Sequence, residues 1–167
     1  MFSLKQCNYI LFLTITLILS SCYSFTGGAI PPHLKSLFIL SVEDNSGYGY
    51  PRFRNEMNDK ILDVFRNDNS FTLANYGGDA KLEVVITSIS DQTVSIQQGE
   101  LESERRLTIS VKAVYYDNVK DVEIWNKTFS KYQSYDISNP QVNRDNAGSI
   151  VVEQLSNDIL IAVVSGW

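Results

Sequence analysis

The chain has 167 residues, with 14 Lys and Arg against 19 Asp and Glu, and its formal net charge is −5. A hydrophobic share of 44% is enough to build a folded core, so the sequence is not that of a disordered acidic chain, and its acidic balance argues against a nucleic-acid-binding protein. One histidine and two cysteines exclude zinc fingers, disulfide-stapled scaffolds and most histidine-based metal sites.

Residues 1–21 are predicted to be a lipoprotein signal peptide that is removed from the mature chain. A short polar start with Lys5 precedes an uncharged run, 9–19, which has the length of a signal-peptide core rather than of a membrane span. The run ends in the sequence LSSC, which resembles a bacterial lipobox and places Cys22 at the position that becomes the acylated first residue. The alternative is a plain secretory signal with an incidental cysteine. We predict that Cys22 carries diacylglycerol and acyl groups, which anchor the protein to a membrane.

The mature chain is expected to start with a lipidated tether, 22–35, followed by a single domain, 36–167. The tether contains Gly27-Gly28 and Pro31-Pro32, which are typical of a linker. The apolar run 36–42 predicts a buried strand, and 43–47 predicts a turn. A helix is expected to begin near Pro51 and to end around 67–69. Its apolar residues recur at spacings of three and four and form one stripe: Phe53, Met57, Ile61, Val64 and Phe65.

The middle of the chain predicts strands. Residues 71–74 form a short strand, and the alternation in 80–87 indicates a strand with one face in the core, which continues irregularly to Gln97. The most regular alternation lies in 106–113, and the aromatic-rich segment 122–135 is a further strand. These last three strands are expected to form an antiparallel meander.

A final helix is predicted to begin at Asn139-Pro140, with Asn139 as the N-cap and Pro140 at the first position. Its apolar stripe is Ala147, Ile150, Val151, Leu155, Ile159, Ala162 and Val163. The predicted fold is α+β, with two helices packed on one face of a mostly antiparallel sheet of about four strands.

Residues that could perform catalysis are scarce. His33 lies beside two prolines in the predicted tether, and we expect it to be a solvated linker histidine. Glu100, Glu102 and Glu104 lack the glycine and the second acidic cluster of an EF-hand loop, so we expect a solvated hairpin end. The sequence therefore predicts no enzyme, no metal site and no cofactor apart from the acyl groups on Cys22.

Basic residues near the most regular strand are candidates for binding an anion. Arg105 and Arg106 begin that strand, and a guanidinium group binds phosphate bidentately. Three lysines could extend the patch on neighbouring strands: Lys112, Lys127 and Lys131. The alternative is local pairing with the nearby glutamates, which contributes little at an exposed site.

Two tyrosines on the aromatic strand are candidates for an interface. Tyr132 and Tyr135 have opposite parity, so both cannot point into one core in a regular strand. At least one of them is expected to be exposed or at a bulge, where tyrosine suits contact with a partner. Core packing accounts for Trp125 and Phe129 on the same strand.

Several segments of the mature chain carry a family resemblance. They are the lipobox cysteine with 23–32, the first strand ending near Asn45, the strand 106–111, the segment 129–136, and an aliphatic final helix that closes on Trp167. Together they resemble the LPS-assembly lipoprotein LptE family, in its divergent Bacteroidetes-like form. One departure is Tyr23 directly after the cysteine, where many members have a glycine.

The resemblance implies a non-enzymatic role in lipopolysaccharide (LPS) transport and assembly at the outer membrane. Members of the family sit as a plug inside the LptD β-barrel translocon, help it to assemble and bind LPS. This places the domain on the periplasmic side, inside or beside an LptD-like barrel, with Cys22 as the lipid anchor. The candidate LPS contacts are Arg105, Arg106, Lys112, Lys127 and Lys131, and the candidate barrel contacts are Tyr132 and Tyr135. Of these positions, the resemblance itself carries over only Cys22.

Two other classes of function stay open. One is a periplasm-facing structural accessory lipoprotein of another outer-membrane assembly or secretion machine, which a different binding partner would reveal. The other is a lipid-anchored hydrolase, which would need a convergent set of titratable residues in a pocket.

Overall fold

The computed structural model describes residues 30–95 and 104–165. Two helices and six strands lie in this part of the chain. In chain order they are β1 (Ser36–Ile39), β2 (Glu43–Asp44), α2 (Pro51–Asp68), β3 (Thr72–Ala74), β4 (Ala80–Ser95), β5 (Glu104–Asp117), β6 (Val122–Asp136) and α3 (Pro140–Ser165).

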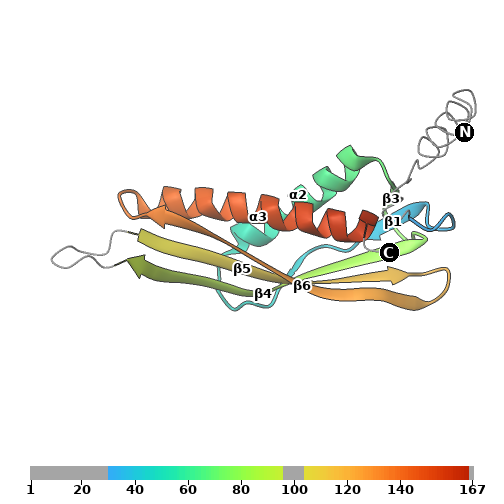
Figure 1. Cartoon of the computed structure of the whole chain (residues 1–167), viewed down its shortest axis with the longest axis horizontal. Helices are drawn as coiled ribbons and strands as arrows, with labels where there is room; N and C mark the ends of the chain where they lie inside the picture. The colour runs from blue at the N-terminus through green and yellow to red at the C-terminus, as the bar shows by residue number, and fades with distance from the viewer. Residues whose placement is uncertain (1–29, 96–103, 166–167) are drawn as a thin grey trace, which may run out of the picture.

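The strands form one mixed sheet with the order β3-β1-β4-β5-β6, and β2 also pairs with β4. The three long strands β4, β5 and β6 form the expected antiparallel meander. The short strands are parallel to their neighbours, β1 to both β3 and β4, and β2 to β4. Both helices lie on one side of the long strands, and α3 runs along them (Figure 1).

The predicted α+β class is confirmed, but the sheet has more strands than the expected four and is partly parallel. The apolar run 36–42 was expected to be one strand, but its regular strand pairing stops after Ile39. A turn was expected at 43–47, but Glu43 and Asp44 pair there with Val85 and Ile86 of β4. Parallel strands need a crossover, and α2 supplies the one that leads from the first strands to β3.

The helix starts agree with the sequence pattern. Helix α2 begins at Pro51, as predicted, and ends at Asp68, and Asn69 caps it in the left-handed conformation with φ of 58°. Helix α3 begins at Pro140 and buries a continuous face against the sheet and α2. The predicted stripe of α3 is wrong at Ile150, which is 42% exposed, whereas Val152 and Ser156 are buried.

One face of the long strands builds the core. In β5 the buried side chains alternate from Leu107 to Asp117, and they face the helices. In β4 the alternation shifts at a bulge between Ile86 and Ser88, which returns Ile89 to the core face. The bulge is the irregularity expected in this strand, because one extra residue reverses the parity of everything that follows.

The segment that precedes β1 is packed on the domain. Leu34 is 2% exposed and belongs to the core. His33 Nε2 lies 2.7 Å from Oδ2 of Asp117, and the imidazole is only 29% exposed. The expectation of a solvated histidine is therefore wrong, because the fold brings this residue to the far end of β5.

Candidate functional site

The five basic candidates do not form one patch, because the sheet divides them between its two faces. Arg105 has the parity of the buried residues of β5, and it therefore lies on the face that carries the helices. Lys127 pairs with Ala113 and Lys131 with Ile109, which places both lysines on that same face. The other two, Arg106 and Lys112, lie on the opposite face of the sheet, which neither α2 nor α3 covers. We call it the open face.

Arg105 is engaged with Asp91 on the neighbouring strand. Its Nε lies 2.9 Å from Oδ1 of Asp91, and Nη2 donates to the carbonyl oxygen of the same residue at 3.0 Å. The hydrogen bond and charge of Asp91 raise the pKa of the Arg105 guanidinium. Arg105 is therefore paired with Asp91, a carboxylate that was not predicted from the sequence as its partner.

Tyr135 completes this cluster from β6. Its hydroxyl donates to Oδ2 of Asp91 at 2.7 Å, and the side chain is 8% exposed. Burial, followed by the hydrogen bond to Asp91, raises the pKa of Tyr135 to about 12. In the isolated chain Tyr135 therefore links three strands, whereas Tyr132 is 57% exposed on the opposite face.

The open face is polar and holds a stacked pair. Arg106 lies over the ring of Tyr132, with 4.3 Å between the guanidinium carbon and the ring centroid. Ser110 and Ser130 face each other with 2.9 Å between their hydroxyl oxygens. Lys112 is exposed on the same face. This surface combines cations, hydroxyl groups and an exposed aromatic ring, which suits contact with a polar partner.

Each of the two lysines of β6 contacts another residue of the domain. Lys131 Nζ lies 2.8 Å from Oδ2 of Asp158 on α3, so the lysine joins the edge strand to the helix. Lys127 Nζ lies 5.1 Å from the ring centroid of Trp125. Charged side chains on an edge strand also oppose pairing with a foreign strand.

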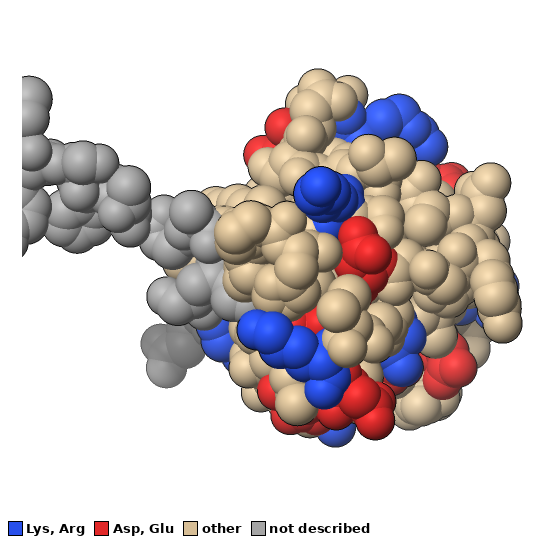
Figure 2. Space-filling model, turned by 90° about the vertical axis from the view of Figure 1, so that its right-hand side faces the viewer, with Lys and Arg blue, Asp and Glu red and all other residues tan. Residues whose placement is uncertain are grey.

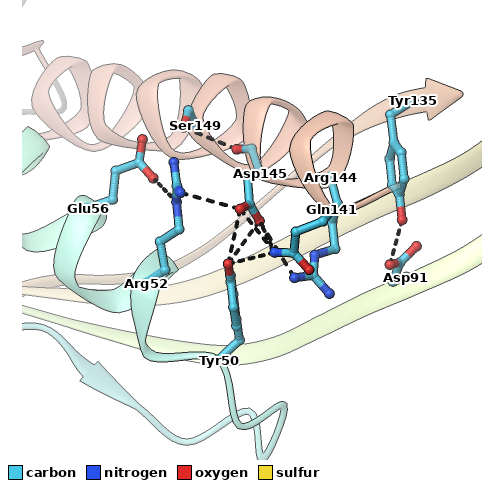
Figure 3. A network of polar contacts seen from close by, with 9 residues as sticks. All are labelled: Tyr50, Arg52, Glu56, Asp91, Tyr135, Gln141, Arg144, Asp145 and Ser149. Carbon is cyan, nitrogen blue, oxygen red and sulfur yellow. Dashed lines mark hydrogen bonds and ion pairs between the residues drawn. The ribbon is translucent and has the colours of Figure 1, made fainter. Parts of the chain in front are cut away.

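A second polar cluster joins the beginnings of the two helices (Figure 3), and no sequence pattern predicted it. Its centre is Asp145 on α3, which accepts hydrogen bonds from Tyr50 at 3.0 Å and from Gln141 at 3.0 Å. Arg52 of α2 donates to the same carboxylate at 3.3 Å, and Arg144 stacks on the ring of Tyr50. Burial raises the pKa of Asp145, but these hydrogen bonds and cations outweigh it and lower the pKa overall.

A cleft of about 310 Å³ separates the two clusters. It is lined by Asp91, Arg105 and Tyr135 on the sheet side and by Gln141 and Arg144 on the helix side. These groups can recognise polar ligands, but they contain no nucleophile paired with a base. In the two described ranges, no group of three or more His, Cys, Asp or Glu could hold a metal ion.

Some predicted positions cannot be placed. Cys22, Glu100 and Glu102 lie outside the described residues, so lipid attachment stays a prediction. Of the helices that the structure describes, α3 alone is long and apolar enough to cross a membrane by length and composition. Half of its apolar window is buried inside the fold, where it packs on the sheet.

A family model identifies the family of the chain, and solved structures share its fold. A family model described as "LptE: Lipopolysaccharide-assembly" matches residues 34–163. No curated protein matches the sequence at a significant level. The fold is similar to that of the rare lipoprotein B from Shewanella oneidensis, with a TM-score of 0.56 and 14% identity over 79% of this chain and 96% of that one.

Two further solved structures share the fold. A protein from Xanthomonas campestris has a TM-score of 0.57 and 13% identity, and the match covers 83% of this chain and 91% of that one. A minor lipoprotein from Acinetobacter baumannii has a TM-score of 0.54 and 13% identity over 80% of this chain and 94% of that one. At these identities the likeness establishes the arrangement of helices and strands.

Proposed function

Since the chain belongs to the LptE family of lipopolysaccharide-assembly proteins, we propose that it is an outer-membrane lipoprotein that serves as plug and assembly partner of an LptD-like β-barrel and binds LPS. The observation that carries the proposal is the family match, which runs from Leu34 to Val163 and covers almost all of the described fold. The cleft between the sheet and α3 is lined by charged and polar side chains that can bind a ligand, which is consistent with a binding role.

The layering of the domain suits a plug. Both helices cover one face of the long strands, which leaves the opposite face of β4, β5 and β6 open (Figure 1). That face carries polar side chains such as Ser110 and Ser130. The lumen of a wide outer-membrane barrel is polar, so a domain with such a surface can fill it without burying unpaired apolar area.

Anchoring at Cys22 would hold the domain at the periplasmic side of the outer membrane. The lipobox-like sequence that ends at Cys22 supports it, and two of the structural neighbours are described as lipoproteins. Several acyl chains on one cysteine give stable membrane attachment, at about 0.8 kcal/mol for each buried methylene group. Tyr23 stands where an aspartate would favour retention in the inner membrane.

LPS binding is the finer part of the proposal, and the open face supports it better than the helix-covered face. Arg106 and Lys112 lie on the open face, where they can reach the phosphates of a ligand. Arg105 and Lys131 are engaged with Asp91 and Asp158. We therefore propose Arg106 and Lys112 as the LPS contacts, with Tyr132, which lies beside Arg106, as a contact to the barrel or the ligand.

Purification of the native lipidated protein in mild detergent tests the proposal. We expect a much larger outer-membrane β-barrel to co-purify in stoichiometric amount. Tyr132→Ala should reduce its yield, and Val142→Ala, a matched change at an exposed position of α3, should not. A protein that purifies alone would contradict the proposal, and a different stoichiometric partner would favour an accessory role in another outer-membrane machine.

A further inference from the structure

Two loops meet at one end of the sheet. The loop 75–79 between β3 and β4 lies against the turn between β5 and β6, because the amide N–H of Asn118 donates to the carbonyl of Asp79 at 2.9 Å. The side-chain amide of Asn118 also donates to the carbonyl of Gly78 at 2.7 Å. We call these residues, 75–79 and 117–122, the tip. The tip lies at the opposite end of the long strands from the start of α3 (Figure 1).

The tip presents large apolar side chains to the outside. Tyr76 is 89% exposed, and its ring lies 6.3 Å from that of Phe38 on β1. Val119 is 59% exposed and Val122 is 47% exposed. Scattered exposed apolar residues are ordinary, but one end that gathers an aromatic ring and two β-branched side chains indicates contact with an apolar partner.

The segment that leads back to Cys22 is fastened to this same tip. His33 Nε2 lies 2.7 Å from Oδ2 of Asp117, whose carboxylate also accepts the amide N–H groups of Val119 and Lys120. The amide N–H of Lys35 donates to Oδ2 of Asp79 at 3.0 Å. Because both loops hold the segment, the chain enters the domain at the tip.

The length of the chain before Ile30 limits where the acylated cysteine can lie. The eight steps from Cys22 to Ile30 span at most about 28 Å when fully extended. Strand β5, with 14 residues, is roughly 45 Å long. The anchor can therefore reach a bilayer at the tip, and it cannot reach one that touches only the far end of the sheet.

We propose that the tip rests on the surface of the lipid bilayer, with Tyr76, Val119 and Val122 entering the headgroup region. The inference rests on the proposed anchoring through Cys22. Tyrosine suits this depth because its ring can contact apolar groups while its hydroxyl stays in water, and aliphatic side chains bury apolar area there. In a bilayer without the barrel, the long strands then stand away from the membrane surface, with the β4–β5 end farthest from it.

The charge of the tip indicates which lipids it meets. Within the tip, Lys120 is positive and Asp79, Asp117 and Asp121 are negative, and Lys35 and Glu123 lie next to it. Figure 2 shows basic and acidic side chains mixed with other residues on this end of the molecule. With both signs present, contact is made through the apolar side chains, and a zwitterionic bilayer is the partner that fits.

The test uses the full lipidated chain in phosphatidylcholine vesicles, with a fluorescent label on a single introduced cysteine. Tyr76→Cys and Val119→Cys place the label at the tip, and Val94→Cys places it at an exposed position near the other end of the sheet. An acylated Cys22 has no free thiol, so the wild-type protein should take up no label. A lipid with a nitroxide near its headgroup serves as the quencher.

We expect the quencher to reduce emission at positions 76 and 119 by at least about half, since interfacial side chains enter roughly 5–10 Å, and to leave position 94 unchanged. Equal quenching at positions 119 and 94 would mean that the domain lies flat, and no quenching at 76 or 119 would mean that the tip is off the membrane. Either result overturns the inference while leaving the anchor intact. Label on the wild-type protein would instead show a free thiol, either Cys22 or Cys7 of an uncleaved signal peptide, and refute the anchoring on which the inference rests.

Discussion

A β-carbon added to Gly148 would lie 2.0 Å from Cε1 of Phe53, so α2 and α3 meet at a point that only glycine leaves open. Phe53 is fully buried, and Gly148 is one of the buried residues in the first half of α3. The contact fixes how closely the two helices approach above the sheet. It also reverses the usual effect of glycine in a helix, where alanine is the more stable residue.

Gly148→Ala is therefore expected to destabilise the domain by about 1–3 kcal/mol, because the phenyl ring must leave its position in a close-packed core. The free energy of unfolding from chemical denaturation measures the effect. Asn146→Ala is the matched control, since this residue is exposed on the same helix and should be neutral or slightly stabilising. A Gly148→Ala protein as stable as the control would refute the close contact.

Asp145→Asn is expected to lower the free energy of unfolding at neutral pH by about 1–3 kcal/mol, because hydrogen bonds to the charged carboxylate from Tyr50, Gln141 and Arg52 are weakened. The pKa of Asp145 is lower in the folded state than in the unfolded chain. Its contribution is therefore present above about pH 4 and is lost as the pH falls through the folded-state pKa.

Unfolding measured across acid pH should show a smaller loss of stability below about pH 4 for Asp145→Asn than for the wild type. Asp63→Asn is the control, because Asp63 pairs with Arg66 at an exposed site. If the free energy of unfolding changes with pH in the same way for Asp145→Asn and the wild type, Asp145 does not contribute to stability through its ionised carboxylate.

Arg106→Ala with Lys112→Ala is expected to weaken LPS binding in vitro, because both cations lie on the open face. Arg105→Ala should leave LPS affinity unchanged and lower stability instead, since it leaves Asp91 without its cation. Binding to labelled LPS and denaturation, measured on the same proteins, separate the two effects. If Arg105→Ala weakens LPS binding as strongly as the open-face double variant, the division between the faces is wrong.

His33→Ala is expected to loosen the segment before β1 without unfolding the domain. Without the imidazole, the carboxylate of Asp117 still accepts hydrogen bonds from the amide N–H groups of Val119 and Lys120, so the turn between β5 and β6 keeps its conformation. Hydrogen exchange at residues 33–36 should become faster, while the exchange of β5 stays unchanged. Lys35→Ala removes an exposed side chain nearby and should leave hydrogen exchange unchanged both at residues 33–36 and in β5. If His33→Ala also leaves exchange at residues 33–36 unchanged, the histidine does not hold this segment on the domain.

Local patterns predicted much of this fold. The alternation in β5 and the prolines at the helix starts gave the meander and the starts of both helices, because strand parity and φ at proline are local properties. Pairing between distant segments was not accessible in this way. Glu43 and Asp44 form a strand only because β4 offers an edge, and the exposure of Ile150 depends on how α3 packs against the sheet and α2.

The candidate site was predicted less well, for a reason that one pair of residues makes clear. Adjacent residues of a strand point to opposite faces, so Arg105 and Arg106 could not share one patch, and their numbers alone showed it. The Asp145 cluster carried no comparable signal. Tyr50 and Asp145 lie 95 residues apart and meet only after both helices have packed.

Depletion of the protein from its native cells, followed by measurement of LPS at the cell surface, is the decisive test of its role in LPS assembly. We expect surface LPS to fall and LPS to accumulate on the inner side of the envelope, with recovery on expression of the wild-type chain. Normal surface LPS after complete depletion would contradict a role in LPS assembly.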